Sequence, residues 1–437
     1  MASLPNDLSA FWMPFTDNRS FKSEPRLLAR AKDMHYWTPD GRKVLDGTAG
    51  LWCVNAGHCR QPIVDAISRT AAELDFGPTF SLAHPLAFEF ASKLARVTPE
   101  GLDHIFYANS GSEAVDTALK IALAYQRSIG QGTRTRLIGR SRAYHGVNFG
   151  GVSVGGIVTN RRVYPSLPGT DYLPHTFNHG EQAFSKGQPA WGGHLADALE
   201  DLVALHGADS IAAVIVEPLA GSTGVLPPPV GYLEKLRQIT TKHGILLIFD
   251  EVITGFGRMG TPFASQFLGV TPDIMTMAKG LTNAAVPMGA VAASGMVHDA
   301  IVNNAAPGIE LFHGYTYSGH PLAAAAGIAT LGLYQDEGIF DNAAALSGYW
   351  QDAMHSLRDA PHVHDIRDMG IIAGIELTPS PKGAGLRAKE VFHRCFDLGV
   401  LIRVTGDIIA LSPPLILQRE HIDEIVDRLR EALEVTA

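Results

Sequence analysis

The sequence is poor in cysteine, and its few cysteines form no recognisable framework. Cys53, Cys59 and Cys395 are the only three thiols in 437 residues. An odd number without metal-ligand spacing argues against a disulfide-stapled secreted domain and against a zinc site built on thiolates. The expected location is therefore a reducing cytoplasm.

Long hydrophobic runs are also missing. The most apolar stretches, residues 286–297 and 321–334, are too short or too interrupted by glycine and proline to span a bilayer. Residues 1–7 lack both the basic and the apolar regions of an export signal. We expect neither export nor a membrane partner.

Charge is sparse and mostly negative. Charged residues make up 18% of the chain, and the net charge is −9. An acidic protein is a poor ligand for nucleic acid or for an anionic membrane, so we expect neither as a partner. Hydrophobic residues reach 46%, and this length allows two domains with substantial cores.

Two common site motifs are absent or incomplete. His313 and His320 are the nearest histidine pair in the motif region, but their spacing matches no zinc signature, so we expect no metal. Residues 255–260 formally match the dinucleotide fingerprint. Thr261 and Pro262 follow, where the fingerprint requires a long helix, and this disfavours a dehydrogenase.

The most informative segment present is residues 244–251. Its apolar run ends in Asp250 and Glu251, which indicates a buried parallel strand that delivers an acid to the ligand-binding edge of a sheet. Residues 273–278 repeat this pattern and end just before Lys279. An acid and an amine on neighbouring strand ends suit pyridoxal phosphate, whose aldehyde condenses with a lysine and whose ring nitrogen needs an anion. Solvated loop residues are the alternative.

A second signal lies where the expected strand 104–108 meets an expected helix. Ser110, Gly111 and Ser112 at this junction leave backbone N–H groups and hydroxyls free to hold a phosphate at the positive end of the helix. The same residues are ordinary helix-capping chemistry when taken alone. Their combination with Asp250 and Lys279 favours the phosphate.

Six motifs occur in the order and spacing of one family. They are residues 109–114, 144–146, 217–218, 250–258, 278–280 and 316–321. On these motifs the chain resembles the class III, fold type I, pyridoxal-phosphate aminotransferases, over nearly its whole length. Residues 12–16, 46–58 and 401–407 are similar to those of the ω-amino acid:pyruvate, or β-alanine:pyruvate, transaminases.

The fold class expected is α/β. Helices alternate with buried strands over residues 60–325, which predicts a large domain with a mainly parallel sheet between helices. Residues 1–59 and 326–437 are expected to form a smaller α+β domain from both termini, as the resemblance implies. Residues 150–192 are weakly periodic and are expected to form a long irregular loop.

Roles for the central residues follow from chemistry. Burial would lower the pKa of Lys279, so that its amine can attack the coenzyme and shuttle a proton. Asp250 would keep the ring nitrogen protonated. The resemblance implies that Val252 and Tyr144 cover the two ring faces, that His145 and Glu217 border the coenzyme, and that Thr316 reaches its phosphate from the other subunit.

Arg403 is the expected substrate anchor. It lies on an apolar strand, where a permanent charge is costly unless it meets an anion. The resemblance implies that it binds the substrate carboxylate. A structural ion pair is the alternative, and Glu217 is its candidate partner. By resemblance, the walls of the substrate pocket are Phe15, Trp52, Phe80 and Tyr144.

The expected function is transfer of an amino group from a β-alanine-like ω-amino acid, or from an amine, to pyruvate. The resemblance implies a homodimer with shared active sites, and a tetramer stays open. Other class III donors, such as GABA, taurine, a diamine or an ornithine-like compound, remain alternatives. So do an aminomutase or decarboxylase on the same scaffold, and a fold that binds the coenzyme without catalysis.

Overall fold

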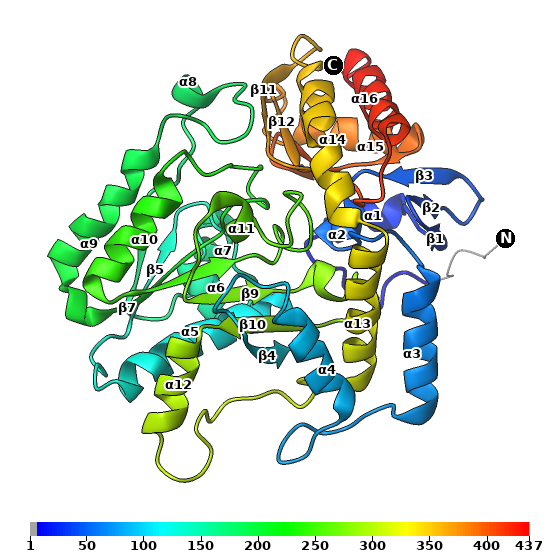
Figure 1. The fold of residues 1–437 in the computed structure, drawn as a ribbon. Coiled ribbons are helices and arrows are strands. Elements are labelled where there is room, and N and C mark those ends of the chain that lie inside the picture. The colour runs from blue at the N-terminus through cyan, green and yellow to red at the C-terminus, as the bar shows by residue number, and fades with distance from the viewer. Residues whose placement is uncertain (1–6, 437) are drawn as a thin grey trace.

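The computed structural model describes residues 7–436, so residues 1–6, on which most of the export-signal prediction rests, lie outside it. A seven-stranded sheet with helices on its faces forms the larger part, and two four-stranded sheets form the smaller part (Figure 1). The strands are β1 Arg30–Lys32, β2 His35–Trp37, β3 Lys43–Asp46, β4 His104–Ala108, β5 Arg136–Arg140, β6 Thr170–Leu173, β7 Ile211–Val216, β8 Leu246–Asp250, β9 Ile274–Met277, β10 Gly289–Ala293, β11 Val363–Asp368, β12 Ala373–Leu377, β13 Val400–Leu401, β14 Arg403–Thr405 and β15 Ile408–Leu411.

The helices lie between these strands and at both ends. The α-helices are α1 Asn18–Ser23, α2 Ala49–Trp52, α3 Gln61–Glu73, α4 Pro85–Leu94, α5 Gly111–Ser128, α6 Phe149–Val154, α7 Val158–Val163, α8 His179–Gln182, α9 Ala198–His206, α10 Tyr232–His243, α11 Ala264–Leu268, α12 Gly295–Asn304, α13 Pro321–Asp336, α14 Ile339–His355, α15 Leu386–Asp397 and α16 Arg419–Glu434. Three 3₁₀ helices are η1 Gly193–Asp197, η2 Ala208–Ser210 and η3 Lys279–Thr282.

The large sheet is mainly parallel, as the sequence predicted. Its strand order is β4-β10-β9-β8-β7-β5-β6, and only β10 runs antiparallel to its neighbours. Every residue of β7 and β8 is buried, which explains their continuous apolar sequences. Asp250 pairs with Thr276 in the parallel register of β8 and β9, so the acid and Lys279 reach the same sheet edge.

Segments from the two ends of the chain share one small sheet. β13 pairs in parallel with β3, through Val400 with Leu45. The other small sheet has the order β11-β12-β15-β14. The predicted domain limits at residues 59 and 325 stay predictions, and the second falls within the continuous helix α13.

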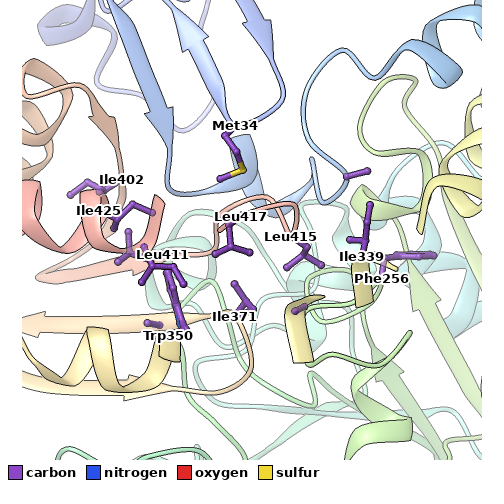
Figure 2. Packing of buried hydrophobic residues seen from close by; sticks show 14 of the residues in the cluster. Met34, Phe256, Ile339, Trp350, Ile371, Ile402, Leu411, Leu415, Leu417 and Ile425 are labelled. Atoms are coloured by element: carbon purple, nitrogen blue, oxygen red, sulfur yellow. The ribbon is translucent and has the colours of Figure 1, made fainter. Parts of the chain in front are cut away.

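One apolar core joins the two parts of the molecule. Trp350, Leu411 and Ile425 from the C-terminal region cluster with Met34 from the N-terminal region and with Phe256, which follows β8 (Figure 2). The small sheets are therefore packed firmly against the loops that leave the large sheet.

The prediction of a long irregular loop over residues 150–192 is wrong. This region holds α6 (in part), α7 and α8, and also β6, which pairs in parallel with β5 at the sheet edge. Within residues 7–436, no helix has the length and apolarity needed to cross a bilayer.

Candidate active site

A cavity of about 150 Å³ opens at the carboxyl ends of β8 and β9. It collects eight of the residues that the sequence singled out, although they come from five separate segments of the chain. These residues are Gly111, Ser112, Tyr144, His145, Glu217, Asp250, Val252 and Lys279. Gly146, Ile253 and Ala278 complete the lining.

Lys279 follows β9 and starts η3 in a strained backbone conformation. Its φ of +54° lies in the left-handed region that non-glycine residues rarely adopt, and such strain clusters at functional sites. Burial of its amine lowers the pKa of Lys279 from 10.5 to about 8, and the positive charge of Arg403 acts in the same direction. About a tenth of this amine is thus neutral and nucleophilic at pH 7.

Asp250 is held by three groups at the end of β8. Its Oδ2 lies 2.8 Å from Nδ1 of His145, and its Oδ1 accepts from the Thr276 hydroxyl at 3.1 Å and from the backbone N–H of Val252 at 3.2 Å. An ionised carboxylate only accepts hydrogen bonds, so His145 carries its proton on Nδ1. Its buried Nε2 has no partner among the described residues. These bonds fix Asp250 in one orientation at the cavity.

The N-terminus of α5 forms another wall. The hydroxyl of Ser110 accepts from the backbone N–H of Glu113 at 3.1 Å, so among the described residues the first-turn N–H groups left for an anion are those of Gly111 and Ser112. A Cβ at Gly111 would lie 3.1 Å from Val252, and one at Gly146 would lie 2.5 Å from the hydroxyl of Ser112. Glycine at both positions therefore lets three segments close around the helix end.

Glu217 stabilises the loop backbone and does not bind Arg403. Its two carboxylate oxygens accept from the N–H groups of Tyr144 at 3.0 Å and Gly221 at 3.3 Å. Burial raises the pKa of Glu217. Across residues 7–436, no ion pair involves Arg403, so the predicted pairing of Glu217 with Arg403 is wrong.

Arg403 itself lies on β14, partly buried and near the cavity. Burial lowers the pKa of Arg403, while Tyr144 and Cys53 act in the opposite direction. An unpaired guanidinium in this position is available for an anion that enters from solvent.

The remaining predicted wall residues lie outside the cavity of this single chain. Trp52 is buried in an apolar cluster beside Ile253. Phe15 and Phe80 are 82% and 60% exposed, and Thr316 is exposed as well. Their roles in binding stay predictions.

The sequence analysis did not identify two residues that lie near the site. Thr276 binds Asp250, and the only signal for it was a hydroxyl within an apolar strand. Cys53 lies close enough to Lys279 that each affects the pKa of the other. Its position in the chain, next to Trp52, gave no indication of this.

His313 and His320, the histidine pair considered in the sequence as a possible zinc site, each contact another group of the protein. Nε2 of His313 lies 2.9 Å from the Thr117 hydroxyl, and Nδ1 of His320 accepts from the backbone at the start of α13. Within the part of the chain that the structure describes, one group of potential ligands, His104, His298 and Asp299, lies at the amino end of β4, on the opposite sheet edge from Lys279.

The donor set fits pyridoxal phosphate. The cavity offers an amine at Lys279, a fixed carboxylate at Asp250, and a helix N-terminus cradled by glycines for an anion. The sequence profile of the family Aminotransferase class-III matches residues 18–433. The chain belongs to the class-III aminotransferases.

Relatives and solved structures agree with this assignment. The aminotransferase is 65% identical to the ω-aminotransferase of Caulobacter vibrioides, over 98% of both chains. It is 45% identical to the β-alanine–pyruvate aminotransferase of Pseudomonas aeruginosa, over 98% of this chain and 96% of that one. The crystal structure of the ω-transaminase of Pseudomonas jessenii in complex with PMP superimposes with a TM-score of 0.91 at 31% identity, covering 97% and 96% of the two chains.

Proposed function

We propose that this aminotransferase uses pyridoxal phosphate to move an amino group from an ω-amino acid such as β-alanine, or from an amine, to pyruvate. The products are an aldehyde or ketone and alanine. The observation that carries the proposal is the pairing, at one sheet edge, of a lysine of lowered pKa with a fixed, buried carboxylate. The activities for which the relatives are named support the substrates, and the PMP of the solved structure supports the coenzyme.

When bound, pyridoxal phosphate would supply two groups. Its aldehyde reacts with either the lysine amine or the substrate amine, and its ring accepts electrons from the substrate carbon. Lys279 would hold the coenzyme through its amine and would move a proton at the substrate carbon. Asp250, oriented by His145 and Thr276, would keep the proton on the ring nitrogen. Gly111 and Ser112 would present backbone N–H groups to the phosphate.

The substrate side is assigned to Arg403. Its unpaired guanidinium binds the carboxylate of pyruvate by two parallel hydrogen bonds. Tyr144 and Val252 bound the ring. Phe15, Trp52, Phe80 and Tyr144 form the walls that select the donor.

We place the enzyme in the cytoplasm as a homodimer. The side chains of Phe80, Phe88 and Phe312 are 60–90% exposed in the single chain, and such apolar surface favours a partner subunit. The ring of Phe80 lies against Gly314, two residues before the exposed Thr316, which would complete the phosphate site of the partner.

The test is a panel of donors with pyruvate, scored by alanine release: β-alanine, GABA, taurine, putrescine and 1-phenylethylamine. Turnover with β-alanine or 1-phenylethylamine is expected, and Lys279→Ala should abolish it in a folded protein. Alanine from putrescine alone would move the assignment within the family. Conversion of a donor without any keto acid would favour a mutase or decarboxylase, and normal turnover by Lys279→Ala would refute the proposal.

A further inference from the structure

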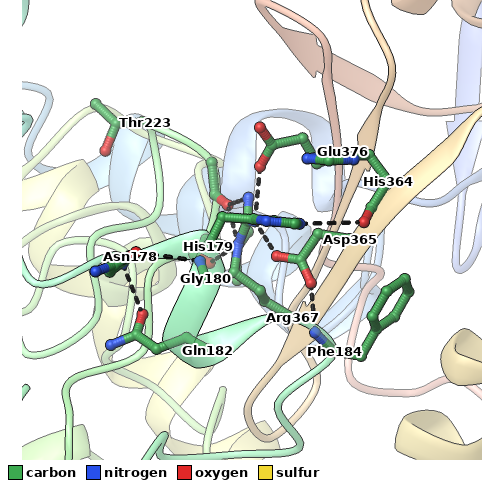
Figure 3. A network of polar contacts seen from close by, with 12 residues as sticks. Asn178, His179, Gly180, Gln182, Phe184, Thr223, His364, Asp365, Arg367 and Glu376 are labelled. Carbon is green, nitrogen blue, oxygen red and sulfur yellow. Dashed lines mark hydrogen bonds and ion pairs between the residues drawn. The ribbon is translucent and has the colours of Figure 1, made fainter. Parts of the chain in front are cut away.

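A buried arginine joins a small sheet to a loop of the large domain. Arg367 lies on β11 with 1% exposure. Its Nη2 donates to the carbonyl of Gly224 at 2.9 Å, and its Nε donates to the carbonyl of Val225 at 3.1 Å. These two residues belong to residues 220–225, which we call the 220–225 loop. The guanidinium thus binds across the boundary between the two parts of the molecule (Figure 3).

The same guanidinium is also held from its own sheet. Its Nη1 donates to Asp365 on β11 and, at 2.7 Å, to Glu376 on β12. The ring of Phe177, which follows β6 in the large part, lies against its plane. A Cβ at Gly374 on β12 would lie 2.8 Å from the carbonyl oxygen of Gly224, so loop and sheet backbones are in close contact. Arg367 therefore has little freedom to follow the loop if the loop shifts.

On its other side the 220–225 loop holds the cavity wall. The Thr223 hydroxyl donates to the carbonyl of Arg142 at 2.6 Å, and Nη2 of Arg142 donates to the carbonyl of Thr223 at 3.1 Å. Glu217 accepts from the N–H groups of Gly221 and Tyr144. The loop is consequently tied to Tyr144 by two independent routes.

Packing adds a third connection. A Cβ at Gly221 would lie 3.0 Å from Cδ1 of Ile253, which lines the cavity beside Val252. Close-packed contacts of this kind transmit a displacement because they leave no free volume to absorb it. A shift of the loop would move Tyr144 and Ile253 together.

The charge on Arg367 needs an explanation beyond stability. Replacing a buried ion pair by apolar residues is often neutral or stabilising, so such a pair is weak evidence for a stabilising role. Its bonds to two loop carbonyls instead specify one placement of the loop.

We propose that Arg367 is a positioning residue. It makes the positions of Tyr144 and Ile253 at the cavity depend on how the small domain packs against the 220–225 loop. The inference rests on the proposed function, because the cavity is taken to hold the coenzyme.

The first test needs no coenzyme. Hydrogen exchange of residues 220–226 is compared in coenzyme-free wild type, Arg367→Met, Arg367→Lys and Thr223→Val. Losing hydrogen bonds to a charged group should speed exchange in Arg367→Met about tenfold, and Arg367→Lys should recover part of the protection. The control is His355→Leu, which removes a 3.0 Å contact to Asp368 on the same strand but none to the loop.

The second test measures affinity for pyridoxal phosphate by its absorbance. Arg367→Met and Thr223→Val should each weaken binding of pyridoxal phosphate. Because both residues act on one loop, the double variant should lose less binding free energy than the sum of the two single losses. His355→Leu should lower the melting temperature and leave exchange and affinity unchanged. Two results would overturn the inference. One is that Arg367→Met, Arg367→Lys and Thr223→Val fold and keep the exchange rates and coenzyme affinity of the wild type. The other is that His355→Leu loses as much exchange protection and affinity as they do. Failure of the wild type to bind coenzyme would instead sink the proposed function, while the exchange data still decide the coupling of Arg367 to the loop.

Discussion

At the scale of single residues, we expect the amine of Lys279 to control the pH at which the protein captures the coenzyme. Burial favours its neutral form, so its pKa is about 8. Capture of pyridoxal phosphate by the coenzyme-free protein should therefore accelerate with rising pH, reach half its maximum near pH 8, and level off above it. Stopped-flow absorbance at a series of pH values measures this. A rate still climbing through pH 10 would mean that Lys279 keeps the pKa of an exposed lysine.

The sequence identified the chemical groups of the site better than their pairing. Asp250 and Lys279 were predictable because Asp250 ends one mainly apolar strand and Lys279 closely follows another, and the register of β8 and β9 brings them together. The predicted pairing of Glu217 with Arg403 was wrong because the hydrogen-bond donors to Glu217 are backbone N–H groups, which the identity of side chains does not reveal. The role of Arg367 was missed for the same reason, since its loop partners are carbonyls.

At the scale of elements, the start of α5 depends on a glycine from another segment. Gly146 has a φ of +90°, and a Cβ there would meet Ser112 at 2.5 to 2.9 Å. Gly146→Ala should displace the first turn of α5 and weaken binding of pyridoxal phosphate at least about tenfold, because the proposed phosphate contacts depend on that turn. Titration of the coenzyme-free variant by absorbance gives the affinity.

Gly130 offers a matched control at the other end of α5. Its φ is +78°, but a Cβ there would meet nothing within 4 Å. Gly130→Ala carries the same kind of backbone strain, of about 1 kcal/mol in unfolding free energy, without a clash. Equal losses of coenzyme affinity in both variants would mean that strain, and not the position of Ser112, is responsible.

The elements that sequence patterns missed are those with weak patterns. β5 is a short strand with an arginine at each end and Gly139 inside, and β6 contains Thr170 and Asp171. A Cβ at Gly139 would lie 1.9 Å from the carbonyl of Val154, so the residue that weakens the strand pattern is required by packing against α6. The strong pattern of β8 predicted that strand well because its burial is continuous, and the start of α5 was predicted from its capping residues.

At the scale of the whole molecule, residues predicted for one site lie on different surfaces of a single chain. Thr316 is exposed and does not line the cavity of Lys279. The segment around it is nevertheless ordered against its own chain, since the Thr79 hydroxyl donates to the carbonyl of Ser318 at 2.8 Å. An exposed segment that is hydrogen-bonded to its own chain and flanked by the exposed rings of Phe312 and Tyr317 is suited to meet a second copy of the chain.

Mixing two inactive variants distinguishes a shared site from a self-contained one. Thr316→Asp should place a negative charge against the phosphate, and Lys279→Ala removes the attachment point. If Thr316 serves the partner, a mixed dimer has one site with both defects and one with neither. Random re-association then restores about a quarter of the wild-type activity, because half the dimers are mixed and half their sites are intact. If Thr316 served its own subunit, each site of the mixed dimer would carry one defect and no activity would return. Mixing Lys279→Ala with Lys279→Arg supplies the control, because every site then lacks the lysine whichever subunits associate.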